Sequence, residues 1–352
     1  MPITRFPRLA LLLASAVVVS PAPRSTAAPA SSDSAVPAAR SFEVSYRAVV
    51  GDLPAGAGRV ELWVPYPQSD ENQQVEVVAV EAPTAYQVST EPRFGNRMLH
   101  LAADRPRQPI VVELRAHVVR REVARRDLSR AASRGRPERD PALAQWLTAD
   151  RLVPLDGRIR ALAAEVTAGA RTDVERARAI YDFVVDSMSY DKSGTGWGNG
   201  DIYWACDMKR GNCTDFHALF TGLARAAGIP AKFAIGLPIP AERGAGQVAG
   251  YHCWAEFWLD DYGWVPVDTS EARKHPERRD YYFGAHDADR VELTEGRDLV
   301  LRPAQQGPPL NFFVYPYAEV DGKPHTGVEQ TFAYRDLATT FPPASEGSPS
   351  RP

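Results

Sequence analysis

The sequence has few cysteines and only one long apolar run, which lies at its start. Cys206, Cys213 and Cys253 are the only cysteines among 352 residues. Because three is an odd number, pairing within the chain leaves at least one thiol free or intermolecular. After Val19 no stretch approaches the length of a transmembrane helix. We therefore expect no stable membrane insertion by the remainder of the chain.

The sequence also lacks an excess of basic charge. Its formal net charge is −3, and residues 1–28 carry three arginines and no acidic residue, so without them the charge is −6. A mildly acidic chain is a poor candidate for nucleic-acid binding, and we expect no such partner. Eight arginines do gather between 120 and 141, but acidic residues are interspersed among them. This mixture favours a solvated linker over a patch for anionic surfaces.

The first residues have the pattern of a secretory signal peptide. Arg5 and Arg8 precede the apolar run Leu9–Val19, and small residues follow at Ser25–Ala30. The apolar run is too short to span a bilayer as a helix, and no cysteine follows it to carry a lipid. We predict a signal peptide at 1–28, cleaved near Ala27 or Ala28, and a protein that is periplasmic or secreted.

The rest of the chain changes from β texture to helical texture. Short alternating runs such as Phe42–Tyr46 and Val60–Val64 are separated by Pro and Gly clusters, which is typical of a small β-sandwich. Helical periodicity begins near Asp156. The predicted order is a flexible lead-in at 29–40, a β-sandwich domain at 41–123, an Arg-rich linker at 124–155, a catalytic domain at 156–300, a C-terminal β extension at 301–342 and a frayed tail at 343–352.

One cysteine lies where a helix is predicted to begin. Gly211-Asn212-Cys213 precedes a run with apolar residues on one helical face, and Gly228 and Pro230 follow that run. Asn212 is a plausible N-cap, which places Cys213 in the first turn. Unpaired N–H groups and the helix dipole stabilise a thiolate there, and the Cys213 N–H can face an oxyanion. By itself this position is equally compatible with structural packing.

A histidine and an aspartate flank a predicted β-hairpin. A turn at Asp260–Gly263 separates two apolar runs, and His252 and Asp268 lie equally far from residue 260. In an antiparallel hairpin such residues lie opposite each other, about 5 Å apart at Cβ. Asp268 would then orient the imidazole, leaving its other nitrogen to exchange a proton with a thiol. Cys213, His252 and Asp268 together form a predicted nucleophile, base and orienting acid.

Several motifs resemble the core of the transglutaminase-like superfamily, and they occur in that family's order of Cys, His and Asp. They are Gly211-Asn212-Cys213-Thr214-Asp215-Phe216-His217, Gly228-Ile229-Pro230-Ala231, His252-Cys253-Trp254-Ala255-Glu256 and Gly263-Trp264-Val265-Pro266-Val267-Asp268. The resemblance covers about 156–298 and implies an α+β, papain-like fold, with a cysteine-bearing helix packed on an antiparallel sheet. An all-β region before such a core is common in that family.

The resemblance implies nucleophilic attack by Cys213 on an amide carbonyl of a protein or peptide, with His252 as base and acid and Asp268 as its orienting residue. The resulting acyl-enzyme is passed to an amine or to water. Animal transglutaminases have tryptophan after the cysteine, whereas this chain has Thr214, and no acidic cluster indicates a calcium site. Transglutamination and an exported peptidase or amidase therefore both stay open. No cofactor is expected.

Two other classes of protein compete with the enzyme. A zinc site is conceivable from Cys206, Cys213, His217 and Cys253 or His252, although the close cysteine pairs of most structural zinc sites are missing. A non-catalytic peptide-binding module is disfavoured by the complete set of three catalytic residues. Trp204, Trp254 and His217 are candidates for oxyanion binding or the cleft wall, with a core histidine the simpler interpretation of His217.

The remaining cysteines pose a question about disulfides. If Cys213 stays free, Cys206–Cys253 is the one intramolecular bridge left. Strand alternation places Cys253 on the face opposite His252, toward the core, where a buried free cysteine behaves as a small apolar group. We therefore predict no disulfide.

Overall fold

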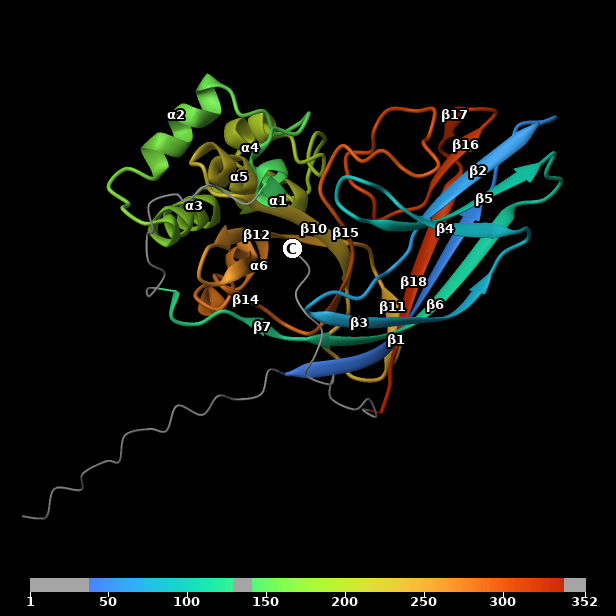
Figure 1. Cartoon of the computed structure of the whole chain (residues 1–352), viewed down its shortest axis with the longest axis horizontal. Coiled ribbons are helices and arrows are strands. Elements are labelled where there is room, and N and C mark those ends of the chain that lie inside the picture. Colours follow the sequence, from blue (N-terminus) through green and yellow to red (C-terminus); the bar gives the residue numbers. More distant parts are fainter. Residues whose placement is uncertain (1–37, 129–140, 339–352) are drawn as a thin grey trace, which may run out of the picture. The chain divides into compact units, whose positions relative to one another are not determined.

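The computed structural model describes residues 38–128 and 141–338 (Figure 1). The predicted signal peptide, most of the lead-in, the middle of the Arg-rich linker and the predicted tail lie outside the described residues. Within the described part, no helix is both long enough and apolar enough to cross a bilayer.

Two five-stranded antiparallel sheets form a β-sandwich. The strand order of the first sheet is β11 (Ala245–Val248), β18 (Val328–Asp336), β1 (Ala39–Val50), β6 (Ile110–Arg121) and β3 (Gln73–Glu81). The order of the second is β17 (Lys323–His325), β16 (Tyr317–Val320), β2 (Arg59–Pro65), β5 (Arg97–Asp104) and β4 (Tyr86–Thr90). Strands from three separate stretches of the chain thus build one sandwich, where the sequence had indicated a domain at 41–123 and a separate extension at 301–342.

Alternating apolar residues of the strands pack between the two sheets of the sandwich. Val44, Tyr46 and Ala48 of β1 point inward, as do Leu62 and Val64 of β2, and all are buried in one apolar cluster. That cluster continues into the part of the chain that the sequence predicted to be catalytic, since it also contains Cys213, Phe233, Ile235 and Cys253. Burial of such side chains supplies the main favourable free energy of folding.

A four-stranded antiparallel sheet carries the candidate site. Its strand order is β13 (Gly263–Val267), β12 (His252–Leu259), β10 (Ala231–Pro238) and β15 (Arg290–Glu295). Two short pairs accompany it, β7 (Val123–Ala124) with β14 (Ala285–His286) and β8 (Ser189–Tyr190) with β9 (Arg210–Gly211).

The helices gather around α5 (Figure 1). They are α1 (Pro141–Ala144), η2 (Gln145–Leu147), α2 (Gly157–Val166), α3 (Asp173–Ser187), α4 (Ile202–Met208), α5 (Cys213–Ala226), α6 (Thr269–Lys274) and η3 (Pro276–Arg278). Asp156 caps α2, where the sequence predicted helical texture to begin, and Thr172 caps α3. Helix α5 is buried along nearly its whole length and packs on β12 and β10. The expected α+β fold, with a cysteine-bearing helix on an antiparallel sheet and an all-β region before it, is confirmed.

One residue of the Arg-rich stretch departs from the prediction of a solvated linker. Arg120 is fully buried near the end of β6. Its guanidinium donates to Gln73 Oε1 at 3.2 Å and lies 5.9 Å from the centre of the Trp254 ring. Charge mixing along the sequence could not reveal this, because the partners come from distant strands.

Candidate active site

Cys213 is the first residue of α5, as the sequence predicted. The Asn212 side chain accepts the Thr214 N–H at 2.9 Å, and the Asp215 carboxylate accepts the Asn212 N–H at 3.0 Å. The Asn212 side chain also accepts the Asp215 N–H, and this bond and the one from Asn212 N–H to the Asp215 carboxylate form a capping box that fixes where the helix begins. Among the described residues, no acceptor is bonded to the Cys213 N–H. That donor is therefore available to an oxyanion.

Cys213 is only 2% exposed, and its thiol is surrounded by groups that favour the ionised form. Burial alone would raise its pKa, but hydrogen bonds with the Cys253 and His252 side chains and the charge of His252 outweigh burial, so the pKa lies well below its ordinary value. Cys253 shows the complementary effect, because burial and the neighbouring Cys213 raise its pKa. A thiolate is thus favoured at Cys213 and a neutral thiol at Cys253.

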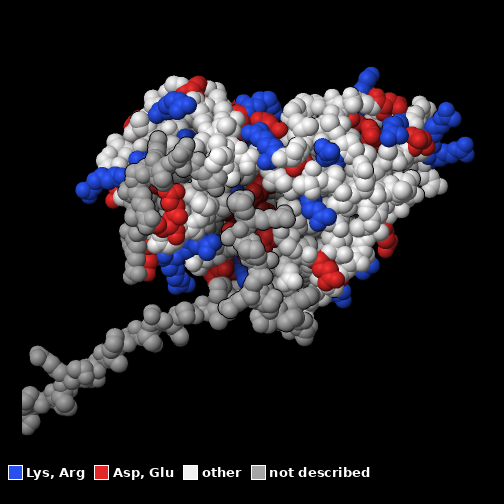
Figure 2. Space-filling view, in the orientation of Figure 1, with Lys and Arg blue, Asp and Glu red and all other residues white. Residues whose placement is uncertain are grey.

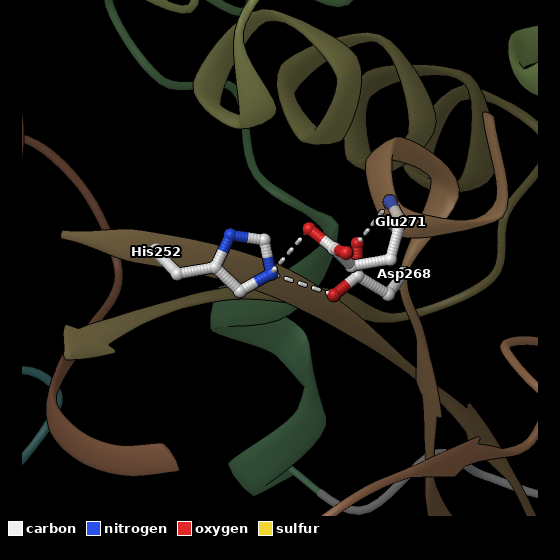
Figure 3. Close-up of side chains that lie close together, drawn as sticks. All are labelled: His252, Asp268 and Glu271. Carbon is white, nitrogen blue, oxygen red and sulfur yellow. Dashed lines mark hydrogen bonds and ion pairs between the residues drawn. The ribbon is translucent and has the colours of Figure 1, made fainter. Parts of the chain in front are cut away.

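His252 and Asp268 form a buried hydrogen bond. His252 Nε2 lies 2.7 Å from Asp268 Oδ2, and the other ring nitrogen points away from the carboxylates (Figure 3). Burial opposes the imidazolium, but Asp268 and Cys213 outweigh it and raise the pKa of His252 to about 10. For Asp268 the charge of His252 outweighs burial, so its pKa lies well below the usual range. Charge complementarity stabilises an imidazolium between a thiolate and a carboxylate.

The hairpin register differs from the one predicted. Ala255 pairs with Val267 and Leu259 with Gly263, so the midpoint is residue 261 and not residue 260. The strand ends at Val267, and Asp268 is the N-cap of α6. Asp268 reaches His252 from a helix start, because its backbone leaves the strand there. The residues meet as expected, but the reasoning about directly opposed positions was wrong.

The two carboxylate oxygens of Asp268 bond different groups. Oδ1 accepts the Glu271 N–H at 3.0 Å and the Ser270 hydroxyl at 3.0 Å, which caps α6. Oδ2 faces His252. The sequence allowed either capping or orientation, and the structure shows that one carboxylate does both.

Asp215 and Arg297 hold the glycine-rich loop at 193–200 against the start of α5. The buried Asp215 carboxylate accepts N–H groups of Gly198 at 2.7 Å and Gly200 at 3.0 Å. Arg297 donates to the carbonyl oxygens of Gly200 and Asn199, each at 2.8 Å. The sequence assigned neither residue a role, although Asp215 lies in the motif that begins at Gly211 and its spacing from Asn212 is a capping-box signal.

Tyr251 was also missed. Its hydroxyl accepts from Asn212 Nδ2 at 2.9 Å and lies 2.9 Å from Thr214 Oγ1, so it ties the residue before His252 to both neighbours of Cys213. Nothing in the sequence marks this contact, because it joins elements that lie far apart along the chain.

The three candidates for oxyanion binding or the cleft wall lie in different surroundings. Trp204, on α4, places its indole nitrogen against Gly196. Trp254 is fully buried, and its ring centre lies 6.4 Å from that of His252. His217 is fully buried, accepts the Thr269 N–H on Nε2 at 3.2 Å and places Nδ1 3.6 Å from Cys253 Sγ. Burial lowers the pKa of His217, so it is neutral, with its proton on Nδ1.

All three cysteines are free. Among the described residues, His252, Asp268 and Glu271 are the one group whose ligand atoms lie close enough to hold a metal ion (Figure 3). The 2.7 Å hydrogen bond between His252 and Asp268 leaves no space for an ion between them. The residues of the zinc alternative form no such group in the described ranges.

A helix that begins with a buried cysteine, packed on a sheet that supplies a histidine, defines a transglutaminase-like, papain-like core. The model of the transglutaminase-like superfamily matches residues 160–269. An uncharacterized protein of Haemophilus influenzae is 30% identical over 323 residues, covering 80% of this chain and 86% of that one. The chain belongs to the transglutaminase-like superfamily.

One solved structure agrees with this chain on the fold. A candidate cysteine protease from Cytophaga hutchinsonii matches with a TM-score of 0.59 and 14% identity, over 87% of this chain and 93% of that one. The periplasmic domain of TgpA from Pseudomonas aeruginosa matches 68% of this chain and 90% of its own length at 18% identity, with a TM-score of 0.35. At these identities the first likeness supports the fold alone, and the second is too low in TM-score to support an argument.

Proposed function

We propose that the chain is an exported enzyme that transfers acyl groups from amide bonds of a protein or peptide through Cys213. The observation that carries the proposal is the buried 2.7 Å hydrogen bond between His252 and Asp268, together with a buried cysteine at a helix start whose thiol pKa is lowered by that imidazole. The pKa of Cys213 is lowered while that of His252 is raised to about 10, so the two share one proton in favour of the ion pair. Such a pair has a nucleophile and an acid ready in the resting state.

The reaction follows from this arrangement. The Cys213 thiolate attacks the amide carbonyl, and the Cys213 N–H donates to the developing oxyanion. His252 gives its proton to the leaving nitrogen, the C–N bond breaks, and an acyl-enzyme with a neutral imidazole results. Neutral His252 then takes a proton from an incoming amine or water, which releases the acyl group and restores the ion pair.

Hydrolysis and transamidation differ only in this second step. The near-complete burial of Cys213 supports exclusion of bulk water, which favours transfer to an amine. Thr214, which stands where animal transglutaminases have tryptophan, argues against it. Peptide or protein amides are the proposed acyl donors in both cases. Nucleic acid is not a proposed partner, because Lys and Arg are interspersed with Asp and Glu over the face drawn in Figure 2.

The test is labelling and turnover with matched cysteine variants. Purified protein is incubated with a glutamine-containing protein and a fluorescent primary amine, while release of ammonia and new peptide ends are followed in parallel. We expect Cys213→Ala to abolish every product and Cys206→Ala, at a half-buried position on α4, to retain them. Intact mass should show an acyl adduct on Cys213. Product formation that survives Cys213→Ala overturns the proposal.

A further inference from the structure

Arg290 approaches the candidate triad from a strand that carries none of its members. It begins β15 and is only 3% exposed. Its Nη1 lies 3.6 Å from Asp268 Oδ2, the oxygen that also bonds His252. This Nη1 is buried and makes no hydrogen bond among the described residues. Asp268 is thus its nearby counter-charge.

Two contacts fix the guanidinium in this place. Asp287 Oδ1 accepts from Nη2 at 3.3 Å and from Nε at 3.4 Å. The Trp254 ring lies under the guanidinium, with its centre 5.0 Å away. Trp254 follows His252 by two residues on β12, so both side chains leave the same face of the strand. A planar guanidinium suits such stacking, whereas an ammonium does not.

We propose that Arg290 is a positioning residue for the triad: a buried, fixed positive charge that holds the Asp268 carboxylate toward His252 and limits how tightly His252 keeps its proton. The inference rests on the proposed function, because it assigns a role within the same site. Asp268 and Glu271 both favour the imidazolium, and Glu271 Oε1 lies 3.9 Å from His252 Nε2. Without an opposing charge, the imidazolium would be slow to release its proton to the leaving nitrogen.

Other charged groups surround the two residues. On α6, Lys274 pairs with Glu271 Oε1, the oxygen 3.9 Å from His252 Nε2, so Glu271 has its own positive partner, whereas the positive partner of Asp268 is Arg290. From α5, Cys213 and His217 face His252, and His217 is neutral because burial lowers its pKa. From β14 and β6, His286 and Arg120 lie near Arg290, and burial lowers the pKa of His286 to about 4, so it is neutral as well. Arg120 donates to Gln73, and among the described residues the arginine that pairs with Asp268 is Arg290.

The test follows the rate of Cys213 alkylation by iodoacetate against pH. An anionic reagent is attracted by the imidazolium, so the rate falls where His252 loses its proton. Arg290→Met removes a positive charge and should move this alkaline limb up by about one pH unit or more. Arg290→Lys keeps the charge and should leave the limb near that of the parent. Asp287→Asn removes a negative charge and should move the limb down, into an easily measured range.

The controls separate a tuning role from a structural one. Arg225 is a buried arginine at the far end of α5, paired with Asp150 at 2.6 Å. Arg225→Met should lower stability without moving the limb. In protein that already carries Arg290→Met, Asp287→Asn should move the alkaline limb less, because the guanidinium that lies between Asp287 and Asp268 is gone. If Arg290→Met does not fold, the Asp287→Asn shift alone decides.

If the alkaline limb of the alkylation rate stays at the same pH in both Arg290→Met and Asp287→Asn, the inference is wrong. Failure of the proposed function looks different. In that case the parent protein shows no selective alkylation of Cys213, or shows alkylation with the predicted limbs but forms no acyl product.

Discussion

Asp268 supplies the carboxylate on which most of the charge interactions at the candidate site depend. One carboxylate oxygen caps the start of α6. The other oxygen bonds the His252 imidazole and lies near the Arg290 guanidinium. Substitution by Asn preserves the capping acceptor but removes the charge, so the effects on helix α6 and on His252 can be separated.

We expect Asp268→Asn to leave the fold intact and to reduce turnover on the order of 10⁴-fold, because the preferred tautomer is lost. The parent should be active up to about pH 10 and lose activity as pH rises through the pKa of His252. Asp268→Asn removes the charge that raises this pKa, so its alkaline limb should move to lower pH. Glu271→Gln, at 3.9 Å and partly exposed, is the matched control and should move the limb less. A larger shift in the control would contradict the assignment.

Strand β10 lies between β12 and β15 and pairs with both of them at Gly236. Gly236 pairs with His252 on one side and with Glu292 on the other, at a bulge in the β10–β15 register. A Cβ at this glycine would lie 1.8 Å from the carbonyl oxygen of Val291. Only glycine permits that approach, and the approach brings β15 and Arg290 close to the site.

We expect Gly236→Ala to destabilise the protein by about 2 kcal/mol or more, through overpacking against backbone that cannot yield. Activity of the folded fraction should fall too, because β15 must move away from β10 and carry Arg290 away from the site. Gly157→Ala is the control, since a Cβ added at that glycine would meet no atom within 4 Å. Thermal unfolding and initial rates measure both effects. Equal stability of the two variants would show that β15 shifts freely.

Elements with strong local signals were predictable from the sequence. The Cys213 helix was predictable because Asn212 caps it and an apolar face follows. The proximity of His252 and Asp268 was predictable, but its geometry was not, because the turn lies one residue later than expected and the strand ends at Val267, before Asp268. Arg290 and Tyr251 gave no local signal. Their partners lie far along the chain, and only the fold brings them together.

The sandwich as a whole depends on strands from the first and the last parts of the described residues. Strand β18 pairs with β1 along nine residues, from Phe42 with Asp336 to Val50 with Val328. Strand β16 pairs with β2 in the other sheet. Ala318, Phe332 and Tyr334 of these last strands are buried in the common apolar cluster. The segment at 41–123 therefore lacks part of its own core.

We expect a chain that ends at residue 316 to lose cooperative unfolding and to expose apolar surface, because β1 and β2 lose their partners. A chain that ends at residue 338 keeps every described strand and serves as the control. Circular dichroism during heating and binding of an apolar dye measure the difference. An isolated 41–123 fragment that unfolds cooperatively would show instead that the N-terminal strands form a self-sufficient domain.

The pairing of β1 with β18 also sets the order of events during folding. Contacts between strands so far apart in sequence require closure of a very long loop before they contribute, and such topologies fold slowly. The sandwich cannot close on a growing chain, because its final strand is made last. Until then the nascent polypeptide stays without its completed β core, a state in which a chain can still be threaded unfolded through a narrow passage.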